Sequence, residues 1–308
     1  MFIRYGILNT TIDVTSICYT NLKYGNIICI PAVDAFRAAI FTDPHPYIVK
    51  SIFITDNLGA TTEYDGTFVI YIDTISGAVM TNNVPRQHLL LNLDRGITYI
   101  HSKLKIKHGN LLHELPEQKL ALKYLTGDEK VLEIGGNFGR NSLVISYIMQ
   151  QKGNSDLLVL ESNPEIFAKL KENKELNPMQ FHIENAALSK RKLIQSTWLT
   201  IPSDTPQEGY FPVNTLTYSE LKQKYPIAFD TLVLDCEGAF YYILQDMPEV
   251  LDNIKLIIME NDYDDITHKT YVDSVLQANK FEVEYSGTET GTWGPCRDFF
   301  YQVWRKAS

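Results

Sequence analysis

A glycine-rich segment at residues 131–146, VLEIGGNFGRNSLVIS, constrains the fold of this chain more than any other stretch. Val131 to Ile134 is a short apolar run, the glycines that follow allow a tight turn, and apolar residues resume at helical spacing from Ser142. This is the pattern of a strand, a turn and a helix. Such a turn directs backbone N–H groups and the positive end of a helix dipole toward the end of the strand, where open α/β sheets bind cofactors.

The residues of this turn narrow the choice of cofactor. A dinucleotide-binding turn needs glycine at three places, but counting from Gly135 two of them hold Asn137 and Arg140. No Gly-Lys-Ser/Thr follows, so the turn is not a phosphate-binding loop. Glu133 adds a carboxylate that would repel a pyrophosphate and suit a ligand with an ammonium and a sulfonium group. S-adenosylmethionine is such a ligand. A glycine-rich turn that binds no ligand is the alternative.

Polar residues follow the next predicted strands at the same edge of the sheet. The strand at residues 157–160 ends in Glu161, at the spacing where a doubly wound fold places the acid that binds a ribose diol. A third apolar stretch ends in Asn185-Ala186-Ala187, small residues that leave room for an adenine ring. A fourth, at 231–234, leads into Asp235-Cys236-Glu237-Gly238. Two carboxylates and a glycine at a strand end indicate a site rather than packing.

Five segments, in order, resemble the successive motifs of the FkbM-type S-adenosylmethionine-dependent O-methyltransferases: LEIGGNFGRNSL, VLESNPE, ENAALS, TLVLDCEGAF and IIMEND. The resemblance covers roughly residues 110–304. It implies a class I methyltransferase fold, which is a Rossmann-like α/β sheet of seven strands, and methyl transfer to a hydroxyl of a sugar or glycoconjugate. The resemblance also implies which residues form the site. The cofactor loop would consist of Glu133, Gly135, Asn137 and Gly139, and the ribose site of Glu161 with Ser162. The adenine edge would be formed by Asn185 with Ala186, and the reaction centre by Asp235 with Glu237.

A hydroxyl is a poor nucleophile at neutral pH, so methyl transfer needs a base that removes its proton or a metal that lowers its pKa. Asp235 and Glu237 are the candidate bases, although Glu237 has the alternative role of capping the following helix. Asp235 and Glu260, at the ends of what should be adjacent strands, are candidate ligands of Mg²⁺. His182 is a third candidate base, against the alternative of a histidine packed within its strand.

The sequence predicts three regions. Residues 1–82 contain short β-rich runs, at 12–19, 26–33, 47–55 and 67–73, which predict an antiparallel sheet or sandwich that serves dimerisation or acceptor binding. Residues 83–112 form a linker in which apolar spacing predicts one helix over 84–108. Its basic residues lie on a solvated face or bind an acceptor phosphate, such as that of a nucleotide sugar. Residues 113–308 form the methyltransferase domain, with a predicted mobile lid at 202–212 and a second substrate loop at 287–297.

Composition limits the functional class. The formal net charge of −9 disfavours general nucleic-acid binding, and no apolar run reaches membrane-spanning length. The four cysteines lack zinc-site spacing, which predicts free thiols in a reducing compartment, the cytoplasm, or the host cytoplasm if the chain is viral. The predicted function is O-methylation of a sugar or glycoconjugate. The alternatives are methylation of a different small molecule, and a glycan-binding or assembly protein whose methyltransferase-like domain is inactive.

Overall fold

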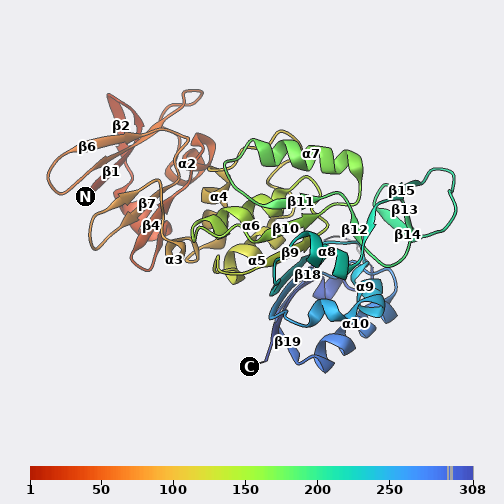
Figure 1. Ribbon diagram of the computed structural model, residues 1–308. Coiled ribbons are helices and arrows are strands. Elements are labelled where there is room, and N and C mark those ends of the chain that lie inside the picture. Colours follow the sequence, from red (N-terminus) through yellow and green to blue (C-terminus); the bar gives the residue numbers. More distant parts are fainter. Residues whose placement is uncertain (290, 292–293, 308) are drawn as a thin grey trace. The chain divides into compact units, whose positions relative to one another are not determined.

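The computed structural model describes residues 1–289, 291 and 294–307 (Figure 1). The chain divides into two compact units, Met1–Leu104 and Lys105–Ser308. The predicted substrate loop at 287–297 lies partly outside the described residues.

The first unit contains two four-stranded antiparallel sheets whose inward side chains share one core. The sheets and their two helices are β2 (Thr10–Asp13), β1 (Phe2–Ile7), β5 (Ser51–Thr55) and β6 (Thr61–Tyr64) in the first sheet; β3 (Lys23–Tyr24), β4 (Ile27–Ile30), β7 (Ile70–Asp73) and β8 (Val79–Met80) in the second; and α1 (Thr15–Asn21) with α2 (Asp34–Phe41). Ile3 and Ile54 of one sheet and Ile28 and Ile72 of the other are buried in this core, so the sheets pack as a sandwich.

Two secondary-structure predictions in this unit are wrong. The run at 12–19 is not one strand, because β2 ends at Asp13 and α1 begins at Thr15, whose backbone N–H donates to the Asp13 carboxylate. The predicted helix over 84–108 is two short helices, α3 (Arg86–Leu89) and α4 (Leu93–His101). The Asn92 side chain accepts the N–H of Arg95, so a new helix begins there and the apolar spacing does not continue as one helix.

A seven-stranded sheet forms the second unit (Figure 1). Its order is β11 (His182–Glu184), β10 (Leu157–Leu160), β9 (Val131–Ile134), β17 (Thr231–Leu234), β18 (Leu256–Glu260), β20 (Tyr301–Lys306) and β19 (Phe281–Gly287). The first five strands are parallel; β20 is antiparallel to both β18 and β19. Numbered along the chain, the order is 3-2-1-4-5-7-6, and the predicted class I methyltransferase fold is confirmed.

Helices cover both faces of this sheet (Figure 1). Leu132, Leu158 and Leu232 point to the face that shares a core with α8 (Tyr218–Lys224), α9 (Phe240–Asp246) and α10 (Ile266–Ala278). The other face carries α5 (Leu115–Tyr124), α6 (Arg140–Gln150) and α7 (Pro164–Glu175), with α5 against α6, β18 and β20. Short 3-10 helices lie at Pro248–Leu251 and Arg297–Phe299. None of the helices in the described part of the chain is long and apolar enough to span a membrane.

An insertion follows β11. The short strands β12 (Ala187–Leu188) and β16 (Thr215–Leu216) pair in parallel and bracket a three-stranded antiparallel sheet of β14 (Leu199–Pro202), β13 (Leu193–Ser196) and β15 (Phe211–Val213) (Figure 1). The predicted lid at 202–212 corresponds to the connection from β14 to β15, and its mobility stays a prediction. Since the strand order reverses between β9 and β17, a ligand crevice is expected above the ends of these strands.

Candidate cofactor site and reaction centre

The turn after β9 lies directly against the end of β17. Gly135 has φ +94°, and a Cβ there would come within 1.6 Å of the carbonyl oxygen of Asp235. Gly139, with φ +83°, begins α6, and a Cβ there would lie 2.5 Å from Leu170 Cδ1. These glycines are therefore required for close packing of the turn. Because Gly135 has no side chain, the turn after β9 can pack directly against the end of β17.

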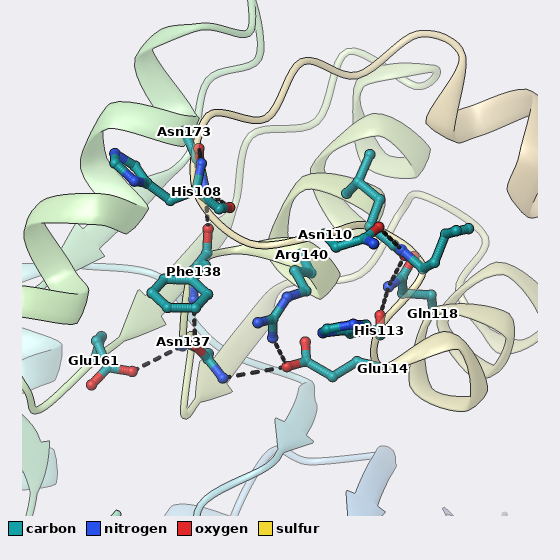
Figure 2. Close-up of polar contacts among 12 residues, drawn as sticks. His108, Asn110, His113, Glu114, Gln118, Asn137, Phe138, Arg140, Glu161 and Asn173 are labelled. Atoms are coloured by element: carbon teal, nitrogen blue, oxygen red, sulfur yellow. Dashed lines mark hydrogen bonds and ion pairs between the residues drawn. The ribbon is translucent and has the colours of Figure 1, made fainter. Parts of the chain in front are cut away.

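A hydrogen-bond network connects the turn to the end of β10 (Figure 2). The backbone N–H of Asn137 donates to Glu161 Oε2 at 2.8 Å, and that of Asn163 donates to Glu161 Oε1 at 2.8 Å. The Asn137 side chain donates to Glu114 Oε1 at 3.3 Å, and the Arg140 guanidinium also donates to that oxygen. Burial raises the pKa of Glu161, and the backbone donors oppose this. The Glu161 carboxylate is thus fixed in position and keeps lone pairs that can accept further hydrogen bonds.

A cleft opens above these strand ends and encloses about 1090 Å³, its open mouth included. Its walls come from the ends of β9, β10 and β17, from α9 and from the insertion. Five of the predicted cofactor residues line it, namely Gly135, Asn137, Glu161, Ser162 and Ala186. The structure therefore gathers residues from three separate motifs around one space.

The other three predicted cofactor residues do not line the cleft. Glu133 is 3% exposed, and burial raises its pKa to about 8. Burial therefore favours the protonated form of Glu133, and the repulsion of a pyrophosphate by Glu133 stays a prediction. Gly139 begins α6. The Asn185 side chain donates to the carbonyl oxygens of Glu161 and Ser162, so it supports the backbone of the site.

Asp235 and Glu237 both line the cleft. Glu237 has φ +50°, so the alternation of side chains along the strand ends before it. Burial, followed by the charges of Glu114 and Glu117, raises the pKa of Asp235 to about 8. For Glu237, burial is the largest cause and a hydrogen bond with Asp262 the second, and together they raise its pKa to about 9. More than a third of Glu237 is exposed, so solvent screening weakens this increase in pKa.

The structure does not support the predicted metal site, and it places His182 outside the cleft. Within residues 1–289, 291 and 294–307, no group of three or more His, Cys, Asp or Glu side chains is placed to hold a metal, so Mg²⁺ at Asp235 and Glu260 is not supported. Glu260, at the end of β18, lines a small hollow together with Asp235 and Glu117. His182 is exposed at the first residue of the edge strand β11, beside the Tyr225 ring. It lies outside the cleft because the site forms at the opposite ends of the strands.

Part of the cleft wall was not predicted from the sequence. Trp198 and Gln195 of the insertion and Tyr242 of α9 line it, and Ser162 Oγ donates to Gln195 Oε1 at 2.9 Å. Arg191 forms an ion pair with Asp246, with Nε 2.6 Å from Oδ2, and its guanidinium lies 4.9 Å from the Tyr242 ring centroid. No motif marks these residues, since they meet only through long-range folding.

No protein-family model matches the sequence, and none of the curated proteins does. Among solved structures, the O-methyltransferase from Bacillus cereus in complex with SAH is 13% identical and covers 73% of this chain and 94% of its own, with a TM-score of 0.40. Methyltransferase FkbM from Methylobacillus flagellatus is 9% identical, and the match covers 71% of this chain and 52% of the FkbM chain, with a TM-score of 0.42. The ribosomal protein L11 methylase from Lactobacillus delbrueckii is 15% identical, and the match covers 66% of this chain and 84% of the methylase chain, with a TM-score of 0.37.

Proposed function

We propose that the chain is an S-adenosylmethionine-dependent methyltransferase that acts on a hydroxyl group of a small molecule. One observation carries the proposal: Glu161, the glycine turn and the pair Asp235 and Glu237 open onto one cleft at the switch point of the sheet. Glu161 has free acceptor capacity for a ribose diol, and Ala186 leaves space for a flat ring. The carboxylates of the wall suit a ligand that carries a sulfonium charge.

When bound, S-adenosylmethionine supplies an electrophilic methyl group. The residues of this chain then have two tasks. The walls of the cleft hold the acceptor oxygen in line with that methyl and exclude water. Asp235, which lies against the glycine turn, takes the proton of the hydroxyl. Glu237 shares the same wall and can contact the acceptor.

The charges around the cleft favour an uncharged or cationic acceptor. In the part of the cleft wall that the structure describes, the guanidinium of Arg191 is paired with Asp246, so an acceptor phosphate would find no free positive partner there. In the predicted basic stretch, Lys107 and His108 both contact Glu172. A nucleotide sugar is therefore disfavoured as the acceptor.

Two aromatic side chains support an acceptor with an apolar face, such as a sugar ring. Trp198 is 53% exposed and Tyr242 is 37% exposed, and both line the cleft. Aromatic rings present broad apolar surfaces together with a polar edge. We propose a sugar or glycoconjugate hydroxyl as the acceptor. The β-sandwich unit is proposed to hold the acceptor or to form a dimer, and the four free thiols support a reducing compartment such as the cytoplasm.

Isothermal titration of the full chain with S-adenosylmethionine, S-adenosylhomocysteine and NAD⁺ tests this function. We expect micromolar binding of the first two ligands and none of NAD⁺. Absence of binding of both sulfur compounds by folded protein would contradict the proposal and favour a glycan-binding protein with an inactive methyltransferase-like domain.

A further inference from the structure

A segment at the start of the second unit, Lys105–Glu114, lies beside the glycine turn (Figure 2). We call this segment the strap, and residues 135–139 the cofactor turn. The structure describes every residue of the strap, and none of them belongs to a helix or a strand. Because such a segment has no helical or sheet hydrogen bonds, its position depends on side chains. The side chains that hold the strap also contact the cofactor turn.

Asn173 of α7 joins the strap to the cofactor turn (Figure 2). Its side chain is fully buried. Its Oδ1 accepts the backbone N–H groups of Lys107 and His108 at 2.8 and 3.0 Å. Its Nδ2 donates to the carbonyl oxygens of His108 and Phe138 at 2.9 and 2.8 Å. Both acceptor sites and both N–H groups of this amide are thus used, and they fix the strap against Phe138 of the cofactor turn.

Gly109 lets the strap lie directly on the cofactor turn. Its φ of +81° is in the left-handed region, which favours glycine. A Cβ at this position would come within 3.0 Å of Phe138 Cδ2 and 3.2 Å of Arg140 Nε. A larger residue would therefore press against both side chains and move the strap away from the turn.

Two carboxylates hold Asn137 of the cofactor turn (Figure 2). The backbone N–H of Asn137 donates to Glu161 Oε2 at 2.8 Å, and its side-chain Nδ2 donates to Glu114 Oε1 at 3.3 Å. The Arg140 guanidinium donates to the same Glu114 oxygen, so an ion pair fixes the strap carboxylate in turn. Glu114 is therefore separated from the proposed ribose acid by a single hydrogen-bonded residue.

The backbone is unusual at both residues of the contact between strap and turn. Glu114 has φ +58° and Asn137 has φ +46°, and both values lie in the left-handed region. Asparagine adopts this region several times more often than most residues, whereas a glutamate there is uncommon. Such backbone strain persists only where the surrounding structure holds it, and it is concentrated at functional sites. Since glycine would suit the backbone at position 114 better, the contacts of the carboxylate explain the glutamate.

We infer that Glu114 is a positioning residue of the cofactor site, and that the strap completes this site from outside the five motif segments. This inference rests on the proposed function. Glu114 fixes Asn137, and the N–H of Asn137 orients the Glu161 carboxylate toward the ribose hydroxyls. Although the whole strap is described, none of its residues lines the cleft. The strap therefore acts on the ligand only through the cofactor turn.

Titration of the full chain with S-adenosylhomocysteine tests this role. Glu114→Gly removes both contacts of the carboxylate and suits the left-handed backbone, and it should weaken binding about fivefold or more. Glu114→Gln keeps an oxygen that can accept from Asn137 and Arg140, so it should recover part of the lost affinity.

A double-mutant cycle with Glu161→Gln separates positioning from a general loss of stability. Because Glu114 acts through Glu161, the double variant Glu114→Gly/Glu161→Gln should bind within about twofold of Glu161→Gln alone. If Glu114→Gly does not fold, Asn137→Gly replaces it in the cycle, since glycine suits φ +46° and removes the same contact.

Glu129→Ala is the matched control. Glu129 accepts the backbone N–H groups of Thr126 and Gly127 at 2.8 Å in the loop before β9, at the opposite end of that strand from the cofactor turn. Its variant loses similar contacts and should bind as the wild type does, and thermal unfolding checks that each variant is folded.

Wild-type affinity in the folded Glu114→Gly variant, or additive losses in the cycle, would overturn the inference. An equal loss of affinity in Glu129→Ala would overturn it as well, because the effect would then be general. Failure of the wild type to bind S-adenosylhomocysteine would instead overturn the proposed function.

Discussion

Replacement of Glu161 by glutamine is the most informative change in the proposed cofactor site. Each carboxylate oxygen accepts one backbone N–H, from Asn137 and Asn163, at 2.8 Å. Glutamine would place an NH₂ group opposite one of these donors and would remove the charge that accepts the ribose hydroxyls. Hydrogen bonds to a charged group contribute about 1.5 to 3 kcal/mol. Affinity for S-adenosylmethionine should therefore fall about tenfold to 150-fold.

The assay is isothermal titration of the wild type, Glu161→Gln and Glu165→Gln, with thermal unfolding measured in parallel. Glu165 is exposed four residues along the chain, so its variant controls for loss of a carboxylate near α7. We expect a modest loss of stability in Glu161→Gln, because one backbone N–H of the turn loses its acceptor. A folded Glu161→Gln protein that binds the cofactor within about twofold of wild type would refute the assignment of the ribose site.

Five further predictions concern this site and the two units of the chain. Asp235→Asn keeps the size of the side chain but removes its basicity, so turnover of a verified acceptor should fall about a hundredfold or more while cofactor affinity is largely kept. EDTA should leave wild-type turnover unchanged; loss of activity that Mg²⁺ restores would show that a metal activates the hydroxyl. Gly135→Ala should unfold the turn and abolish cofactor binding in titrations, since its Cβ would lie 1.6 Å from a backbone oxygen. For Glu133, burial raises the pKa in the folded state to about 8. Its contribution to stability is therefore full at a pH low enough for Glu133 to be protonated in both the folded and the unfolded state, and it is lost as the pH rises through 8. Urea unfolding should accordingly show Glu133→Gln to be more stable than wild type at pH 9 and to lose this advantage at pH 5. A chain that starts at Lys105 should still bind cofactor in titrations, because the two units have separate cores; loss of binding by the folded fragment would show that the β-sandwich completes the site.

The central strands could be predicted because buried parallel strands read as continuous apolar runs. Val131–Ile134, Leu157–Leu160 and Thr231–Leu234 are all apolar apart from Glu133 and Thr231, and all three have the predicted bounds. The polar residues at their carboxyl ends meet because parallel strands end at the same edge. Local sequence was therefore sufficient for the centre of the cleft.

The rest of the site depends on contacts between residues far apart in the chain. The wall formed by Trp198 and Tyr242 needs the insertion to fold beside α9, and no local pattern records that contact. His182 illustrates the opposite error, since its residue type suited a base but its place at the start of β11 keeps it from the cleft. Glu133 shows that burial can oppose a charge that the residue type predicts.

The helical signals failed where a single polar residue decides the boundary. The apolar spacing over 84–108 is periodic enough for one helix, but Asn92 caps a new one and divides it. At the end of β2 the Asp13 carboxylate accepts the backbone N–H of Thr15, the first residue of α1. Such side-chain contacts are short-range, yet they outweigh a weak periodicity.

A crystal structure of the full chain with S-adenosylhomocysteine tests the central claim most directly. The account predicts that the ligand lies in the cleft, with both ribose hydroxyls about 3 Å from the Glu161 carboxylate and the sulfur beside Asp235. A bound ligand whose ribose contacts neither oxygen of Glu161, or whose sulfur lies away from Asp235, would contradict it.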